Sequence, residues 1–425
     1  MLLTDSLDRA KSIYHEYPTQ FWVVIGSSFI DRLGGALMFP FFSLYITRHF
    51  GVGMTEVGIL FTLFSVTSMI GTTLGGALTD YIGRKGMILI GLVVSGLTSL
   101  GMGLVDTLPL FYVMGVVSGL FADMAGPARQ ALIADILPEH KRADGFGIIR
   151  VAMNLAVAIG PAIGGMLAAT SYLLLFVIDT ISSLITAVIV HHAVDETKPE
   201  RTEADTESEN FRETFLGYFQ VLKNSPFMLF LVFSLISTLV YTQMYSSLSV
   251  YLRDFHLVPE QGFGMIMSLN AAMVVLMQFP ITRRIKKFPP MLVMAAGNLL
   301  YAVGFGLYGV VSVYPLFLLA MVVITLGEML TAPTGQAIVA RFAPEQMRGR
   351  YMALMGFSWM IPSAVGPLGA GLIMDGGDPR WVWYLSFILG GVAVVGFTKL
   401  YLMTARKKQT APTAPAGGRP AEGLQ

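Results

Sequence analysis

The chain has 425 residues, of which 54% are apolar and only 13% are Asp, Glu, Lys or Arg. Because soluble globular proteins carry about 25% charged residues, this composition cannot cover a water-facing surface and predicts a protein of the lipid bilayer. The net charge of +1 gives no indication of a nucleic-acid partner, and the absence of cysteine excludes disulfides, thiolate metal sites and cysteine nucleophiles. Neither a metal-binding histidine spacing nor a GxxxxGK[ST] phosphate loop occurs, so we expect no metal, no cofactor and no enzyme.

Twelve apolar runs follow one another along the chain, each long enough to cross a hydrocarbon core about 30 Å thick as a helix. The first run exceeds the length of a signal-peptide core, so we expect it to be retained as a membrane span. Turn-forming residues such as Pro138, Pro226 and Pro289 separate the runs. The expected spans are 20–46, 57–79, 87–106, 109–135, 145–168, 171–193, 227–252, 261–283, 290–312, 314–341, 350–374 and 381–404.

Basic residues are distributed unevenly between the two sides of this expected membrane. If the N-terminus lies in the cytoplasm, 21 Lys and Arg residues fall on the cytoplasmic side, and only Arg48, Arg253 and Arg380 fall outside. Loops rich in Lys and Arg remain in the cytoplasm. The bias therefore predicts a multi-pass protein of the cytoplasmic (inner) membrane with both termini inside.

The pattern of composition divides the chain into four parts. Residues 1–193 and 225–404 each hold six expected spans and form the N-terminal and C-terminal bundles. The acidic segment 194–224 is expected to be a cytoplasmic linker, and apolar residues at helical spacing within 211–222 indicate a short helix on the membrane surface. Residues 405–425, rich in Pro, Ala and Gly, are expected to form a disordered cytoplasmic tail.

An internal repeat relates the two bundles. Ten residues reappear as the same residue type 206 positions later, without a gap. The pairs are Tyr45 with Tyr251, Gly58 with Gly264, Pro127 with Pro333, Gln130 with Gln336, Pro138 with Pro344, Glu139 with Glu345, Arg142 with Arg348, Gly160 with Gly366, Pro161 with Pro367 and Gly165 with Gly371. The repeat predicts an all-α membrane protein with 12 transmembrane helices in two pseudo-symmetric six-helix bundles, related by an axis along the membrane normal.

The turn after the second span carries a family resemblance. Residues 76–85 read Gly-Ala-Leu-Thr-Asp-Tyr-Ile-Gly-Arg-Lys. With the twelve spans and the repeat, they resemble the major facilitator superfamily, whose corresponding loop has Gly, Asp, Gly and a basic pair at this spacing; Tyr81 stands where the family often has a basic residue. The resemblance implies the major facilitator fold and a cytoplasmic gate, with an ordinary charged turn as the alternative. The implied gating residues are Gly76, Asp80, Gly83, Arg84, Lys85 and Asp135.

The fifth span resembles a glycine-proline motif of the 12-helix drug:proton antiporter branch. Gly160 and Gly164 lie on one helix face, where another backbone can approach closely. Two positions depart from that branch: Ala156 replaces a glycine, and Gly115 occupies the place of its usual arginine. The expected helix-packing residues are Gly160, Pro161, Gly164 and Gly165 and, from the repeat, Gly366 and Pro367.

Seven ionisable residues lie inside the spans, where each costs about 2.5–3.5 kcal/mol on insertion scales. They are Asp31, Arg32, Asp123, Arg129, Arg150, Asp179 and Glu328. Glu328 lies in mid-span with no basic residue within one turn, and a carboxyl withdrawn from water favours its protonated form. We expect proton coupling at Glu328, with Asp123 and Asp31 as further candidates. Asp31 could pair with Arg150, or Asp123 with Arg32, and the sequence leaves both open; Asp179 receives no role.

In the fold implied by the resemblance, the first, fourth, seventh and tenth spans line a central cavity. Aromatic and methionine side chains suit amphipathic substrates, although ordinary helix packing accounts for any one of them equally well. The cavity and substrate candidates are Arg32, Met38, Phe42, Arg150, Asn154, Tyr241, Gln243, Tyr245, Thr331 and Gln336.

The function expected from these features is secondary active transport: proton-coupled efflux of lipophilic or cationic small molecules by alternating access, carried out by a functional monomer. The alternative is a major facilitator transporter of a specific metabolite, such as a sugar, amino acid or other nutrient. A non-transporting membrane protein is the least favoured interpretation, since the chain offers no nucleophile, metal motif or large soluble domain.

Overall fold

The computed structural model describes residues 14–198, 219–344 and 347–410. Within these, no account is given of the side chains of Ala77, Asp80, Ala143, Arg348, Gly349 and residues 405–410. The described chain is helical and contains no strand, and twelve of its helices are long and apolar enough to cross a membrane, as the sequence predicts.

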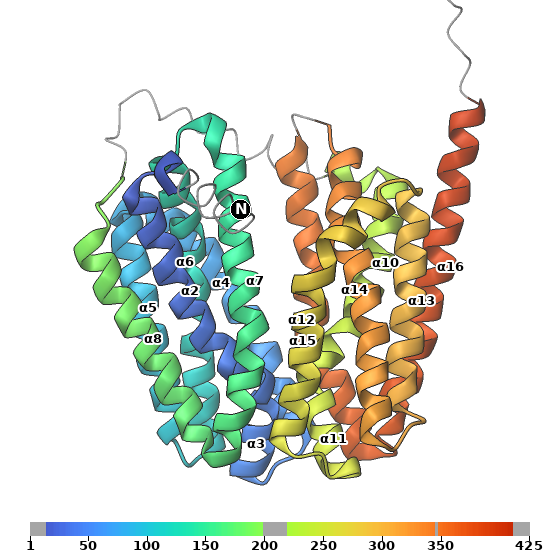
Figure 1. Ribbon diagram of the computed structural model, residues 1–425, viewed down its shortest axis with the longest axis horizontal. Helices are drawn as coiled ribbons and strands as arrows, with labels where there is room; N and C mark the ends of the chain where they lie inside the picture. Colours follow the sequence, from blue (N-terminus) through green and yellow to red (C-terminus); the bar gives the residue numbers. More distant parts are fainter. Residues whose placement is uncertain (1–13, 199–218, 345–346, 411–425) are drawn as a thin grey trace, which may run out of the picture.

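The helices form two groups in chain order (Figure 1). The first group is α2 (Thr19–Met38), the 3-10 turn η1 (Phe39–Phe41), α3 (Phe42–Phe50), α4 (Met54–Ile82), α5 (Arg84–Leu104), α6 (Leu108–Ile136), α7 (Glu139–Thr170) and α8 (Tyr172–Ala193). The second group is α10 (Ser225–Ser246), α11 (Leu248–His256), α12 (Glu260–Ile285), α13 (Pro290–Tyr308), α14 (Tyr314–Phe342), α15 (Arg348–Gly376) and α16 (Arg380–Thr410). The first membrane span therefore comprises α2, η1 and α3, with Pro40 inside the short 3-10 turn between them.

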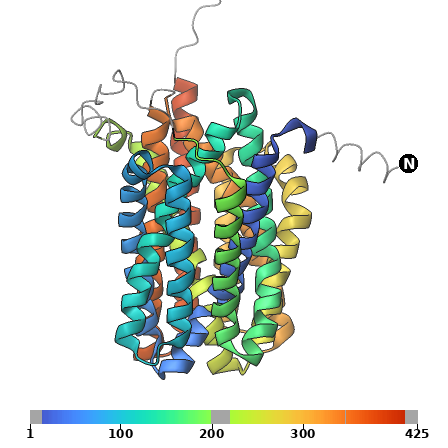
Figure 2. The ribbon, with the colours of Figure 1, turned by 90° about the vertical axis from the view of Figure 1, so that its left-hand side faces the viewer.

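The two groups are separate bundles that stand side by side (Figure 1), and their helices run nearly parallel from one end of the molecule to the other (Figure 2). We call the end that holds residues 194–198 the linker end, and the end that holds α3 and α11 the far end. The halves meet mainly where α4 packs on α15 and α7 packs on α12, while α3 and α11 touch at the far end. The predicted pair of six-helix bundles is thus confirmed.

The 206-residue repeat is visible in the structure. Helices α6 and α14 begin 206 positions apart and end 206 positions apart, and so do α3 and α11. Side-chain contacts repeat with the same offset: the Tyr45 hydroxyl donates to the Met102 carbonyl oxygen at 3.1 Å, and the Tyr251 hydroxyl donates to the Tyr308 carbonyl oxygen at 3.0 Å. Equivalent residues in the two halves therefore occupy equivalent places.

Glycines allow the halves to approach closely along both seams. A β-carbon added to Gly264 on α12 would lie 2.9 Å from the Pro161 carbonyl oxygen on α7, and one added to Gly165 would lie 3.2 Å from the Cα atom of Gly264. At the symmetry-related seam, a β-carbon on Gly58 would lie 2.9 Å from the carbonyl carbon of Pro367. Larger side chains would keep these backbones apart.

The other glycines of the packing motif act within each half. A β-carbon added to Gly160 would lie 2.6 Å from the Cβ atom of Ala36, and Gly164 also faces α2. Gly366 faces α10, where an added β-carbon would lie 2.9 Å from the Thr242 hydroxyl oxygen. The motif therefore determines how α7 and α15 pack inside their own bundles, and also how closely the two bundles approach each other.

The apolar core is shared at the far end and divided at the linker end. One cluster of buried side chains includes residues of both halves, for example Phe41 and Phe263, whose rings lie 5.7 Å apart. Two further clusters, one around Phe21 and Leu132 and one around Phe230, each belong to a single half. The apolar contacts therefore hold the halves together at the far end.

The segments outside the bundles are described only in part. Residues 194–198 run back over the α4–α5 turn, and residues 219–222 are helical; the rest of the expected surface helix lies outside the described residues. Helix α16 continues to Thr410, so it extends past residue 404, the end of the second bundle expected from sequence. The remainder of the expected tail lies outside the described residues.

Candidate functional site

Polar contacts close the far end between the halves. Arg48 Nη1 lies 2.9 Å from Glu260 Oε1, and Arg253 Nη2 donates to the Thr47 hydroxyl at 3.0 Å. The Asp375 carboxylate accepts hydrogen bonds from the first backbone N–H groups of α4, at Met54 (2.9 Å) and the next residue (2.7 Å). A carboxylate at this position also interacts favourably with the positive N-terminal end of the helix dipole.

Glu328 lies half-buried on α14 in the second half. Its Oε2 atom accepts a hydrogen bond of 2.8 Å from the Asn270 amide on α12, and the same amide donates to the Thr325 hydroxyl at 3.0 Å. The Tyr241 hydroxyl also lies within hydrogen-bonding reach of the carboxylate. No Lys or Arg of the described chain forms an ion pair with Glu328. The carboxylate is therefore available to a proton or to a cationic ligand.

Aromatic side chains surround this carboxylate. The Tyr241 and Tyr245 hydroxyls lie 3.3 Å apart, and the Tyr241 ring lies 5.6 Å from the Tyr301 ring and 6.0 Å from the Trp359 ring. The Tyr301 hydroxyl contacts the Thr331 hydroxyl at 3.0 Å. The faces of aromatic rings attract cations, so a cation bound at the carboxylate could also contact these rings. Tyr241, Tyr245 and Thr331 were candidates from sequence, whereas Asn270, Tyr301 and Trp359 were missed; the only signal for Asn270 was an amide inside an apolar span.

The first half faces this group with Arg32 and Phe39 from the first span. Both side chains are exposed, the Phe39 ring lies 6.1 Å from the Tyr245 ring, and Arg32 is close enough to Tyr245 to interact electrostatically. Arg150, also exposed, donates from Nη1 to Gln336 Oε1 at 2.9 Å, so these two candidates bridge the halves between α7 and α14. Asn154 is exposed one turn further along α7.

Three of the cavity candidates point elsewhere. Phe42 is 3% exposed and packs against Phe111 inside the first half. Met38 faces the Ser99 hydroxyl, with Sδ 3.9 Å away. Gln243 is 5% exposed and accepts a hydrogen bond of 2.7 Å from the hydroxyl of Ser247, the residue that follows its own helix. Their contacts within one half favour a packing role over substrate contact.

The membrane charges of the first half pair differently from either possibility left open by the sequence. Asp31 Oδ2 lies 3.4 Å from Arg129 Nη2, not beside Arg150, and Asp31 Oδ1 accepts a hydrogen bond of 2.9 Å from Ser183. Asp123 accepts a short hydrogen bond from the Ser68 hydroxyl and does not pair with Arg32. Sequence spacing could not select these partners because they lie on other helices.

The α4–α5 turn at the linker end contains the expected gating residues. Gly83 has a φ of 105°, which favours glycine, and the buried Arg84 places Nε 3.3 Å from Asp135 Oδ2, the acidic partner implied by the resemblance. Gly76 has open space where a β-carbon would lie. The side chain of Asp80 is not described, so its gating role stays a prediction.

A carboxylate from the linker covers this turn. Glu196 accepts hydrogen bonds from the backbone N–H groups of Arg84 (2.8 Å) and Lys85 (3.2 Å), the first residues of α5. Lys198 Nζ donates to the Tyr81 carbonyl oxygen at 2.8 Å. From sequence this segment is expected only to be a cytoplasmic linker, because nothing in its composition identifies partners more than 100 positions earlier.

Comparisons with known proteins agree with the fold. A sequence model of the Major Facilitator Superfamily matches residues 24–262 and 253–423. A Na(+), Li(+), K(+)/H(+) antiporter of Planococcus maritimus is 27% identical over 405 residues, covering 88% of this chain and 93% of that protein. The quinolone resistance protein NorA of Staphylococcus aureus is 28% identical over 176 residues, covering 40% of this chain and 45% of that protein.

Solved structures show the same fold at low sequence identity. The nucleoside transporter NupG superimposes with a TM-score of 0.73 at 15% identity, covering 91% of this chain and 99% of that chain. A POT family transporter in complex with 5-aminolevulinic acid gives a TM-score of 0.76 at 16% identity, covering 92% and 96%.

Proposed function

The chain belongs to the Major Facilitator Superfamily, and we propose that this transporter exports lipophilic or cationic small molecules in exchange for protons. The observation that carries the proposal is Glu328: a half-buried carboxylate without an ion-pair partner in the described chain, hydrogen-bonded to Asn270 and bordered by Tyr241. A proton and a cation would compete for this one carboxylate. Because binding of each weakens binding of the other, their movements in opposite directions become coupled.

The arrangement of the halves supports alternating access. We take the linker end to be cytoplasmic, because the loops at that end carry most of the Lys and Arg residues. The described conformation would then be closed toward the outside by the shared apolar core and by contacts such as Arg48 with Glu260. Opening outward requires these contacts to break as one half rocks against the other. One chain contains both halves, so a monomer would suffice.

The proposal can be tested with purified protein in liposomes. With a pH gradient imposed, we expect ethidium transport by the wild type, and a drop of at least tenfold in its initial rate for Glu328→Gln, which keeps the shape of the side chain but cannot ionise. Asp106→Asn removes an exposed carboxylate at the far end and serves as the matched control, with no expected change. Gradient-driven efflux at the wild-type rate in Glu328→Gln would refute the coupling assignment.

A second candidate substrate is an alkali cation. Glu328, Asn270 and Thr325 offer carboxylate, amide and hydroxyl oxygens within one cluster, and hard cations prefer oxygen ligands. The relative from Planococcus maritimus, named for exchange of such ions, matches 88% of this chain. Adding Na⁺ or K⁺ to acid-loaded liposomes distinguishes the two: rapid alkalinisation of the lumen without any organic compound favours the alkali cation.

A further inference from the structure

Asp179 is a membrane carboxylate that the proposed coupling at Glu328 does not use. It lies on α8, an outer helix of the first half, and only 9% of it is exposed. Its carboxylate points toward α2, where a β-carbon added to Gly34 would lie 3.1 Å from Asp179 Oδ1. No Lys or Arg in the described chain forms an ion pair with it. A buried carboxylate without a cation is costly, so its charge must be neutralised in another way.

The groups around Asp179 leave one negative charge uncompensated. Asp31 on α2 accepts a 2.9 Å hydrogen bond from Ser183, which lies one turn after Asp179 on α8, and it interacts electrostatically with Asp179. Arg129 on α6 is 3.4 Å from Asp31. Helix α5 contributes the Ser99 hydroxyl beside Asp179. Residues 151–170 of α7 include no ionisable side chain, and Arg150 before them is bonded to the other half. Two carboxylates therefore share one guanidinium inside the bundle.

We propose that Asp31 and Asp179 together bind one exchangeable proton, at a site inside the first half that is separate from Glu328. The proton brings the charge of the two carboxylates and Arg129 to zero. A metal cation does not fit, because the guanidinium already lies against Asp31 and would repel it. Only the role of this site in transport rests on the proposed function. Binding of the proton itself requires only the first half of the protein.

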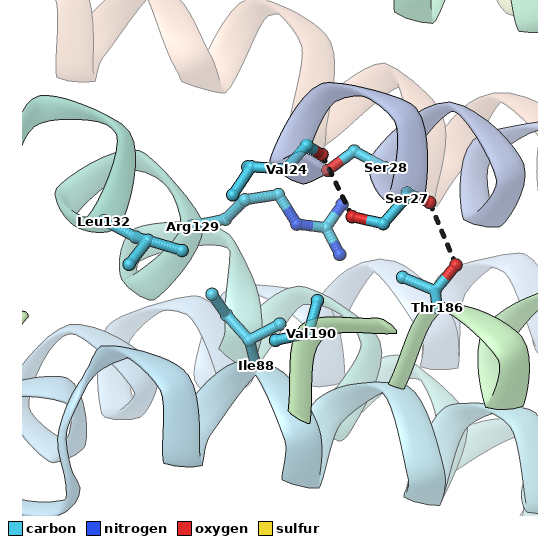
Figure 3. Close-up of a pocket in the computed structure, with 8 residues that line it drawn as sticks. All are labelled: Val24, Ser27, Ser28, Ile88, Arg129, Leu132, Thr186 and Val190. Carbon is cyan, nitrogen blue, oxygen red and sulfur yellow. Dashed lines mark hydrogen bonds between the residues drawn. The ribbon is translucent and has the colours of Figure 1, made fainter. Parts of the chain in front are cut away.

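A small cavity with polar groups lies next to this site, on its linker-end side. Arg129 borders a cavity of about 10 Å³, large enough for one water molecule, together with the hydroxyl-bearing Ser27, Ser28 and Thr186 (Figure 3). The guanidinium points into this space, and a water there could bond both it and the serine hydroxyls. Since α2 begins at the linker end, Ser27 and Ser28 lie closer to that end than Asp31.

Infrared difference spectroscopy of the purified full-length protein, without substrate, tests the proposal through the carbonyl band of protonated carboxyl groups. We expect the wild type to show two such bands. One should be lost in Glu328→Gln. The other should be lost in Asp179→Asn, because the remaining Asp31 and Arg129 then form a neutral pair. Asp31→Asn should lose the same second band, and Arg129→Gln should increase it, since two carboxylates would then lack a cation. Asp106→Asn, which removes an exposed carboxylate of the same half, is the matched control and should keep both bands.

Ser183→Ala keeps the proposal testable if Asp179→Asn does not fold. Loss of the hydroxyl that bonds Asp31 should shift the frequency of the second band and leave the Glu328 band in place. A spectrum unchanged in both Asp179→Asn and Ser183→Ala would overturn the proposal. Because the two bands respond to different variants, failure of this site and failure of coupling at Glu328 can be distinguished.

Discussion

The carboxylate of Asp375, at the end of α15, accepts a 2.7 Å hydrogen bond from the backbone N–H of Thr55, in the first turn of α4 in the other half. The second carboxylate oxygen accepts from the preceding N–H group. One side chain thereby joins the two halves at the far end through the N-terminus of a helix. Any movement that opens this end must separate the pair.

We predict that Asp375→Ala shifts the protein toward conformations open at the far end. A carboxylate at an exposed helix N-terminus contributes up to about 1 kcal/mol, so the open population should rise about fivefold. Because the chain has no native cysteine, nitroxide labels at Thr107→Cys and Val310→Cys can report the distance between the halves by pulsed EPR. Asp378→Ala is the control, since Asp378 bonds Arg380 within its own half. An unchanged distance distribution in Asp375→Ala would contradict the prediction.

Gly264→Val should weaken closure of the same end. The added side chain would begin 2.9 Å from the Pro161 carbonyl oxygen, and overpacking of this kind typically costs about 1–3 kcal/mol. We expect the initial rate of transport to fall at least fivefold and the EPR distance to lengthen. The repeat makes Gly58→Val a second test with the same expected direction. Gly369→Val, where no atom lies within 4 Å of an added β-carbon, is the control; equal effects at Gly369 and Gly264 would argue against a seam-specific cause.

Asn270→Ala should impair the cation site without removing its carboxylate. A hydrogen bond to a charged group contributes about 1.5–3 kcal/mol, which corresponds to a loss of roughly 10- to 100-fold in affinity for a cationic dye. Fluorescence titration of the purified protein with ethidium measures this Kd. Gln278→Ala is the control on the same helix, because its amide bonds the Met329 carbonyl oxygen instead. Wild-type affinity in Asn270→Ala would show that Asn270 does not position Glu328.

Glu196→Ala should release the linker from the α4–α5 turn. The backbone N–H groups of Arg84 and Lys85 lose their acceptor, and because Glu196 is exposed we expect a local loss of about 1 kcal/mol. Amide hydrogen exchange in the first turn of α5 should therefore accelerate about fivefold. Asp195→Ala removes a neighbouring carboxylate and should leave the exchange rate unchanged. Full protection of these amides in Glu196→Ala would exclude the proposed contact.

Much of the fold could be predicted from sequence because lipid imposes a simple requirement. A span must be apolar over about 20 residues, so composition and run length identify the twelve helices. The offset that pairs Gly58 with Gly264 identifies equivalent helices, and the structure places both glycines at the seams between the halves. A small residue within a span can be identified from the sequence alone, without knowing which helix packs against it.

The partners of the membrane charges could not be obtained in this way. Tyr241 and Gln243 are two positions apart on α10, yet Tyr241 reaches Glu328 while Gln243 is buried against its own bundle. Asp31 pairs with Arg129, and a linker carboxylate, Glu196, bonds a turn more than 100 positions earlier.

The sequence by itself therefore determined the membrane class, the spans, the repeat and the position of Glu328 as a mid-span carboxylate, since each is read from apolar run length and residue type. Only the tertiary structure decided the pairing of Asp31 with Arg129, the absence of an ion pair at Asp179 within the described chain and the closure of the far end by Asp375. These depend on how each helix is rotated and which helix lies beside it, and the packing of all helices together determines both.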